Sequence, residues 1–333
     1  MNAIAQPLLR VQDLHIDIHT PTHVKHVVRA VDFSLERGKT LCIVGESGCG
    51  KSLTALALLD LLPAAARRRV AKLEFAGQDL AALTPAALAQ LRGARIAMIF
   101  QDPMTSLNPV FPIGTQLIDV LRRHKRVSRR EAAERAEYLL RRVGIANPGE
   151  RMRQYPFELS GGLRQRVMIA MALMCGPELL IADEPTTALD VTVQAELLDL
   201  LRDIQAEFGL GLVFISHDMG LVARIADHVI VMYAGDIVEA GSVQAVLEPP
   251  QPSLYGDAAE LHSPTPGRTA PRAELPTIAG AVPSLDAAIT GCAFRDRCPV
   301  AEPRCGQPFA ARVQDGHRCY CVKPGAMRHG VPA

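Results

Sequence analysis

The chain has 333 residues, with 36 Lys and Arg against 35 Asp and Glu, which leaves a formal net charge of +1. This balance excludes a general polyanion binder and a long acidic tail, and a hydrophobic content of 48% excludes disorder throughout the chain. Aromatic residues make up 4%, which argues against a stacking surface for single-stranded nucleic acid. No apolar run approaches the roughly 18 residues of a membrane-spanning helix, so we expect none.

The N-terminal part predicts strands before helices. Alternating apolar and polar residues are typical of half-buried strands, and a continuous apolar run is typical of a strand buried on both faces. Pro63 ends the first helix, which we expect to extend to Leu62, and Thr84 caps the second, which ends before Gly93. The predicted elements are strands at 14–18, 28–35 and 41–44, a helix that follows the segment 45–52 and ends at Leu62, a helix at 85–92, and a strand at 97–100.

The middle of the chain predicts a helical insertion and then a return to strands. From about 101 to 165 the pattern is helical, with a capping box at Ser128–Glu131. Apolar strands follow at 179–182 and 212–215, separated by a helix with Ala195, Leu197, Leu198, Leu201 and Ile204 on its inner face. This alternation predicts an α/β fold with a parallel, doubly wound core. Eight prolines between Pro249 and Gly291 then indicate a linker.

The segment GESGCGKS at 45–52 carries the strongest motif, G-x-x-x-x-G-K-[ST]. Its glycines allow backbone N–H groups to surround phosphates, and the helix that follows adds its positive end. Lys51 supplies a fixed charge and Ser52 an oxygen for Mg²⁺. A buried strand before the motif and a helix after it favour a phosphate site over a plain glycine-rich turn.

Polar residues follow three of the other predicted strands. Asp183 and Glu184 come directly after the run at 179–182, where Asp183 is a candidate Mg²⁺ ligand and Glu184 a candidate for polarising water. An exposed acidic turn before Pro185 is the alternative. His217 and Gln101 each follow a strand, and either a γ-phosphate contact or a purely structural role fits such a position.

The order of these motifs, with LSGG at 159–162, resembles the ATP-binding cassette of ABC transporters over about the first 245 residues. The resemblance implies a P-loop NTPase cassette with a mixed sheet core of parallel strands, N-terminal antiparallel strands and a helical subdomain. It also implies a division into a cassette at 1–248, with the helical subdomain at about 103–165, and a linker with an irregular cysteine-bearing extension at 249–333.

The resemblance implies a role for each motif in Mg²⁺-dependent ATP hydrolysis. Two cassettes close around two ATP molecules, and Ser160 at a helix N-terminus presents free N–H groups to the nucleotide of the partner. The ATP-binding residues are Gly45, Glu46, Ser47, Gly48, Cys49, Gly50, Lys51, Ser52 and Gln101. Ser52, Gln101 and Asp183 organise Mg²⁺, Glu184 and His217 are catalytic, Ser160, Gly161 and Gly162 complete the partner's site, and Asp190 belongs to the D-loop at 188–190.

Two departures from the family pattern concern the nucleotide. Leu163 stands where the family usually has Gln after LSGG, and Gln165 lies two places on. The aromatic residue expected to stack on adenine is replaced by Pro21-Thr22-His23.

Segments at 100–109, 160–173, 184–194 and 232–241, together with the tail, resemble the cassettes of dipeptide/oligopeptide and related nickel importers. The resemblance implies a translocase subunit that energises peptide import, bound to the cytoplasmic face of the inner membrane. Its partners would be two permease subunits, a second cassette (identical or paralogous) and, indirectly, an extracytoplasmic solute-binding protein, with no nucleic acid. A nickel or other small-solute importer is the alternative. A soluble ABC ATPase of DNA repair is disfavoured, because no sustained heptads lie between Lys51 and Ser160.

Five of the eight cysteines lie in the last 42 residues. The opening MNAIAQPLLR does not resemble a secretory signal, so we expect a reducing compartment and unpaired thiols. The resemblance places the family's four tail cysteines, which hold a [4Fe–4S] cluster in some members, at Cys292, Cys298, Cys305 and Cys321. Cys319 competes for the fourth place, and zinc or no metal at all are the alternatives.

Overall fold

The structure, a computed structural model, describes residues 6–102, 106–187, 190–247, 280–284, 289–314 and 316–322. The predicted linker up to residue 279 and the D-loop residues Ala188 and Leu189 lie outside these ranges. The chain forms two compact units: unit 1 comprises Met1–Arg10, Ser34–Thr40 and Leu73–Ile215, and unit 2 comprises Val11–Phe33, Leu41–Lys72 and Ser216–Ala333. The predicted boundary at residue 248 falls outside the described ranges and stays a prediction.

Unit 2 contains a mixed sheet. Strand β3 (Thr40–Gly45) runs parallel to β10 (His228–Tyr233), in register from Leu41↔His228 to Gly45↔Met232. On the other side β10 pairs antiparallel with β11 (Asp236–Ser242). Every residue of β3 is buried, as its continuous apolar sequence predicts. Helices α1 (Lys51–Leu58), α9 (Met219–Ile225) and α10 (Val243–Leu247) belong to the same unit.

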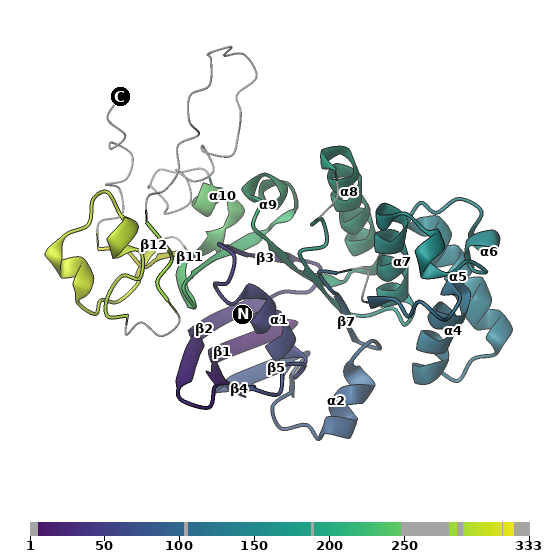
Figure 1. The fold of residues 1–333 in the computed structure, drawn as a ribbon, viewed down its shortest axis with the longest axis horizontal. Coiled ribbons are helices and arrows are strands. Elements are labelled where there is room, and N and C mark those ends of the chain that lie inside the picture. The colour runs from purple at the N-terminus through teal and green to yellow at the C-terminus, as the bar shows by residue number, and fades with distance from the viewer. Residues whose placement is uncertain are drawn as a thin grey trace, which may run out of the picture. The chain divides into compact units, whose positions relative to one another are not determined.

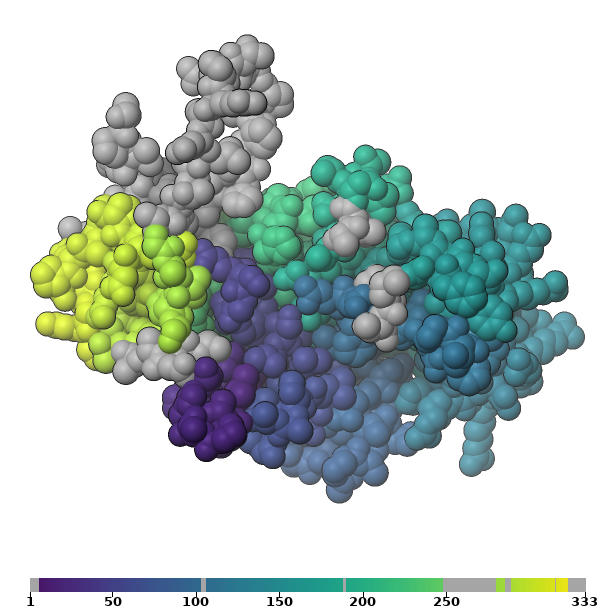
Figure 2. Space-filling view, viewed as in Figure 1, coloured from purple at the N-terminus to yellow at the C-terminus, as the bar shows by residue number. Residues whose placement is uncertain are grey.

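The C-terminal extension continues this sheet. Strand β13 (His317–Cys319) pairs antiparallel with β11, and β12 (Arg312–Gln314) pairs with β13 (Figure 1). The 3-10 turns η2 (Arg295–Arg297) and η3 (Pro303–Gly306) complete the described part of the extension, the yellow lobe in Figure 2. The extension is therefore joined to the strands of unit 2 by backbone hydrogen bonds.

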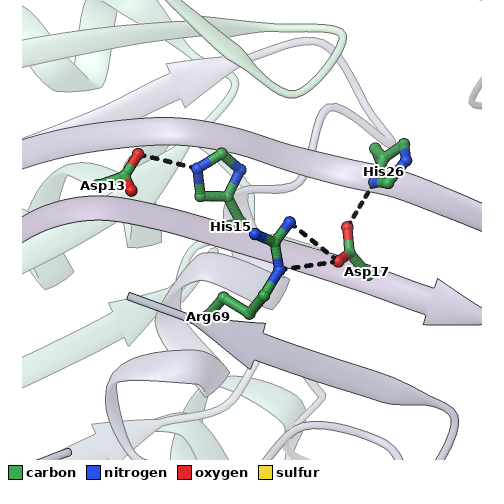
Figure 3. A network of polar contacts seen from close by, with 5 residues as sticks. All are labelled: Asp13, His15, Asp17, His26 and Arg69. Carbon is green, nitrogen blue, oxygen red and sulfur yellow. Dashed lines mark hydrogen bonds and ion pairs between the residues drawn. The ribbon is translucent and has the colours of Figure 1, made fainter. Parts of the chain in front are cut away.

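The N-terminal strands are antiparallel, as predicted. Strand β1 (Leu9–His19) pairs with β4 (Ala66–Arg69), and β2 (Val24–Leu35) follows β1 in the chain. Asp17 on β1 is buried, and it accepts hydrogen bonds from His26 Nδ1 at 2.6 Å and from Arg69 Nη2 at 3.2 Å (Figure 3). Burial raises the pKa of Asp17, but the bonds from His26 and Arg69 outweigh it and hold that pKa below its ordinary value.

The charge on Asp17 therefore stabilises unit 2. A carboxyl whose folded pKa is lowered contributes stability above its unfolded pKa, and this is lost as the pH falls through the folded value. We expect Asp17→Asn to lower the free energy of unfolding by about 1–2 kcal/mol at pH 7. In denaturant titrations the deficit should stay constant down to about pH 5 and shrink below it. Asp13→Asn is the control, because Asp13 is largely exposed beside His15 (Figure 3); an equal deficit for both variants would contradict the assignment.

Unit 1 contains a parallel sheet. Strand β8 (Leu179–Asp183) pairs in parallel with β7 (Ile96–Ile99) on one side and with β9 (Gly211–Ser216) on the other. Strand β5 (Lys72–Phe75) pairs antiparallel with β6 (Gln78–Asp79). Helix α2 (Pro85–Leu91) begins at the predicted cap, where the Thr84 hydroxyl accepts from the Ala87 N–H. Helix α8 (Val191–Phe208) separates β8 from β9 in the chain.

The helical insertion forms a cluster of helices within unit 1, drawn in teal in Figure 1. The capping box at Ser128 is confirmed: its side chain accepts from the Glu131 N–H while Glu131 accepts from the Ser128 N–H. The apolar residues Ala132, Ala136, Leu139 and Leu140 of the helix that follows are buried. The elements are α4 (Ile113–His124), α5 (Arg129–Arg142), α6 (Pro148–Arg151), η1 (Pro156–Glu158) and α7 (Gly161–Leu173).

Several local predictions are wrong in detail. Helix α1 ends at Leu58 rather than Leu62, because Asp60 adopts a left-handed conformation with φ of 54° and Pro63 disfavours helix before it. Strand β7 ends at Ile99, one residue early. On α8 Leu200 is buried, whereas Ala195, which was predicted to lie on the inner face, is only half-buried.

Within the described ranges no helix combines the length and the apolar character needed to cross a membrane.

Candidate functional site

The phosphate-binding motif forms the turn between β3 and α1 in unit 2. Gly45 closely approaches β10, since a Cβ there would lie 2.2 Å from the Met232 carbonyl oxygen. Gly50 adopts a left-handed φ of 103° at the start of α1, and its Cβ would lie 2.8 Å from Val28 Cγ2. Both positions therefore require glycine for steric reasons.

Lys51 lies across this turn. Its ammonium group donates to the carbonyl oxygens of Gly45 at 2.8 Å and Glu46 at 3.0 Å, and the residue is 4% exposed. Ser47 and Gly48 are exposed at the tip of the turn, and Cys49 is buried beneath it. The cation is thus held by the loop that would surround the phosphates, with Ser52 following it in the first turn of α1.

Gln101 and Glu184 come together in unit 1. Gln101 Nε2 donates to Glu184 Oε2 at 3.3 Å, and Thr187 Oγ1 donates to the same oxygen at 3.0 Å. Glu184 has a φ of 45°, a left-handed conformation that costs a non-glycine residue about 1 kcal/mol or more and is concentrated at functional sites. Its N–H donates to the Ile215 carbonyl oxygen, which fixes the strained turn to β9. Sequence reasoning did not single out Thr187.

Asp183 ends β8 and is 5% exposed. A buried carboxylate at the carboxyl end of a parallel strand is costly unless cations or polar groups use it, and such an oxygen is a ligand that Mg²⁺ prefers. The donor types at this end of unit 1, the Asp183 carboxylate and the Gln101 amide, therefore fit the predicted ion.

The signature residues form the start of α7. Ser160 is the N-cap, and its hydroxyl accepts from the Leu163 N–H at 3.4 Å. Gly161 has no positive φ, and a Cβ there would meet nothing within 4 Å; at Gly162 the nearest atom would be Val193 Cγ1 at 3.8 Å. Nothing within the described chain therefore requires glycine at Gly161. Gln165 is only 3% exposed. It therefore cannot take the place, at the protein surface, of the glutamine that the family usually has at position 163.

Two further candidates lie at or next to a helix N-terminus. Asp190 is the N-cap of α8 and accepts from the Val193 N–H at 3.1 Å. His217 belongs to unit 2 and is exposed between β9 and α9, where Asp218 caps the helix. The predicted nucleotide-site residues are thus divided between the units: Gly45–Ser52 and His217 lie in unit 2, and Gln101, the signature residues, Asp183, Glu184 and Asp190 lie in unit 1.

The tail cysteines lie in unit 2 as free thiols. The Cys292 N–H donates to the Cys305 carbonyl oxygen at 2.7 Å. Burial raises the pKa of the Cys292 thiol, and the nearby Cys321, Cys298 and Cys305 raise it further. Burial also raises the pKa of Cys319, to about 12, beside Glu239. Even so, across the described residues no group of three or more His, Cys, Asp or Glu is arranged to hold a metal ion, so the structure does not support the predicted cluster.

Comparison with known proteins places the chain in a family. Residues 28–187 match the family described as ABC transporter, and 238–305 match the oligopeptide/dipeptide transporter C-terminal region. The probable peptide ABC transporter ATP-binding protein y4tR of Sinorhizobium fredii is 47% identical over 96% of each chain. The chain belongs to the ATP-binding subunits of ABC transporters.

Other relatives agree with this assignment of the cassette. The dipeptide transport ATP-binding protein DppD of Bacillus subtilis is 43% identical, covering 95% of this chain and 94% of that one. Among solved structures, the dimeric ATP-binding cassette MJ0796 bound to ADP and Pi has a TM-score of 0.63 at 23% identity, and it covers 71% of this chain and 98% of that one. This second likeness confirms the predicted fold of the cassette.

Proposed function

We propose that the protein hydrolyses ATP to energise the import of di- or oligopeptides through a membrane permease. One observation carries the proposal: the chain matches both the ABC cassette and the oligopeptide/dipeptide transporter extension, and relatives that align along nearly its whole length are named peptide or dipeptide transport proteins. The same match favours peptides over nickel or another small solute.

Each predicted site residue has a proposed task. Lys51 and the backbone amides of 45–50 hold the phosphates, since they combine a fixed charge with N–H donors. When Mg²⁺ is bound, it neutralises charge on the phosphates; Ser52, Gln101 and Asp183 supply the oxygen ligands. Glu184 accepts a hydrogen bond from the attacking water and takes its proton, with Gln101 and Thr187 fixing the carboxylate. His217 donates to the γ-phosphate.

A second cassette completes each site in this proposal. Ser160, Gly161 and Gly162 present the N-terminal N–H groups of α7 to the partner's ATP, and Asp190 belongs to the D-loop at 188–190. The open space around Gly161 supports this arrangement, because a glycine unexplained by its own chain is explained by the close approach of another molecule. The partner is either a second copy or a paralogue.

The permease is proposed to bind near 102–112, the segment that directly follows Gln101. Val110 is 69% exposed and Phe111 49% exposed, which gives this segment apolar surface; residues 103–105 lie outside the described ranges. The proposed assembly has two permease subunits and an extracytoplasmic solute-binding protein, with the cassette on the cytoplasmic face of the inner membrane.

The metal at the tail cysteines stays a prediction. The thiols that raise the pKa of Cys292 are those of Cys298, Cys305 and Cys321, the other three predicted ligands. Cys319 stays the competitor for the fourth place; it is buried on β13, in register with Glu239 of β11. Iron and zinc contents of anaerobically purified protein decide between a cluster, zinc and neither.

Uptake of a labelled dipeptide tests the proposed function. Right-side-out vesicles with the permease, the second cassette and MgATP inside, and the solute-binding protein outside, should accumulate the dipeptide in their lumen only when this subunit is also present. ATP-driven uptake of Ni²⁺ with no uptake of di- or oligopeptides would contradict the peptide assignment.

A further inference from the structure

An arginine of the C-terminal extension contacts the phosphate-binding loop within unit 2. Arg297, at the end of η2, donates from Nη1 to both carboxylate oxygens of Glu46, at 2.9 and 2.8 Å. The same nitrogen lies 3.2 Å from the hydroxyl oxygen of Tyr233, to which it also donates. Glu46 follows Gly45 directly, so the extension reaches the first residue of the loop.

Two aromatic rings restrict the side chain of Arg297. Its side chain is 9% exposed. The guanidinium carbon lies 5.8 Å from the ring centre of Tyr233 and 5.6 Å from that of Phe294, and these two rings meet edge to face. Cation–π contact and ring packing restrict its rotamers, so little conformational entropy remains to be lost when it holds Glu46. The arginine of this ion pair is therefore buried and preorganised, whereas the Glu46 carboxylate is partly exposed.

The charge of Glu46 explains why such a contact matters. Glu46 is the only acidic residue in GESGCGKS, and its side chain is 32% exposed. A carboxylate next to a triphosphate repels it, and this repulsion is large where the solvent is partly excluded. The Glu46 carbonyl oxygen also accepts from the Lys51 ammonium at 3.0 Å, so the conformation of this residue bears on the cation that must reach the phosphates.

We infer that Arg297 is a positioning residue for nucleotide binding: it neutralises and immobilises Glu46, and through it the cysteine-bearing extension sets the affinity of the phosphate-binding loop for ATP. The inference rests on the proposed function, because it assumes that ATP binds at this loop. Arg297 does not contact the reacting atoms in this view and acts only through Glu46.

The test is the dissociation constant of the full-length chain for ATP at low ionic strength. Arg297→Gln leaves the Glu46 carboxylate uncompensated, so we expect ATP to bind about tenfold more weakly. The turnover rate at saturating ATP should change by less than about twofold, since the lost interaction is not specific to the transition state. The deficit should shrink at about 0.5 M salt, because screening weakens the repulsion.

Removal of the carboxylate distinguishes this role from a structural one. In the Arg297→Gln background, Glu46→Gln should restore ATP affinity to within about threefold of wild type, since no charge is left to repel the phosphates. Arg295→Gln is the matched control, because Arg295 lies in the same turn and donates to Asp296 and to the Thr290 carbonyl oxygen rather than to Glu46; it should bind ATP like the wild type.

Other results would overturn the inference. Unchanged ATP affinity in Arg297→Gln would do so, as would a double variant as weak as the single one or a deficit insensitive to salt. If Arg297→Gln fails to fold, the single variants Arg297→Lys and Glu46→Gln are measured instead. Both should bind ATP at least half as tightly as wild type. Weak ATP binding by Glu46→Gln would contradict the inference that the Glu46 carboxylate repels the phosphates. A wild-type chain that binds no ATP would instead overturn the proposed function.

Discussion

Glu184→Gln should abolish turnover while leaving ATP bound. The variant keeps an oxygen that Gln101 and Thr187 hold in place, but it cannot accept the proton of the attacking water. We expect the rate of ATP hydrolysis to fall by about 100-fold or more. The dissociation constant for ATP should stay within about threefold of wild type, and MgATP should drive two cassettes into a stable pair on size-exclusion chromatography.

Glu134→Gln provides the matched control for this experiment. Glu134 is an exposed carboxylate on α5 that pairs with Arg130 one helical turn away, so its loss should leave hydrolysis unchanged. Substantial hydrolysis by Glu184→Gln would show that the base is another residue. Loss of ATP binding in that variant would show that the carboxylate holds nucleotide rather than activating water.

Gly161→Asp should stop hydrolysis without harming the fold of its own chain. A side chain at Gly161 meets nothing within 4 Å, and an acid in the first turn of a helix interacts favourably with the helix dipole. The thermal unfolding midpoint should therefore be unchanged or slightly raised. Turnover should fall by about 100-fold or more, because the carboxylate would point at the triphosphate of the partner cassette.

Arg129→Asp is the matched control for Gly161→Asp. Arg129 occupies the same position on α5, directly after the N-cap Ser128, as Gly161 does on α7 after Ser160. It should keep wild-type hydrolysis. A mixture of the Gly161→Asp and Glu184→Gln chains gives a second measurement. ATP should still drive these two chains to pair, because the intact signature of the Glu184→Gln chain faces the ATP bound by the Gly161→Asp chain. Full hydrolysis by Gly161→Asp alone would contradict the composite site.

Several features of this protein were determined by the sequence alone, because each depends on neighbours along the chain. The P-loop glycines, the capping box at Ser128 and the continuously apolar β3 and β8 all follow from local rules of backbone freedom, capping and burial. The fold class and the family followed from the order of such segments. The predicted helix α1 was too long for a local reason as well, because Asp60 adopts a left-handed conformation.

Only the tertiary structure decided which distant residues meet. Gln101 and Glu184 are 83 positions apart, and Arg297 and Glu46 are 251 positions apart, yet each pair is hydrogen-bonded. No local pattern encodes these contacts, because they depend on how strands order in a sheet and on where an irregular extension packs. The sequence marked Glu184 and Glu46 as residues of an ATPase; the packing of Thr187 and of Arg297 against them shows how each carboxylate is held.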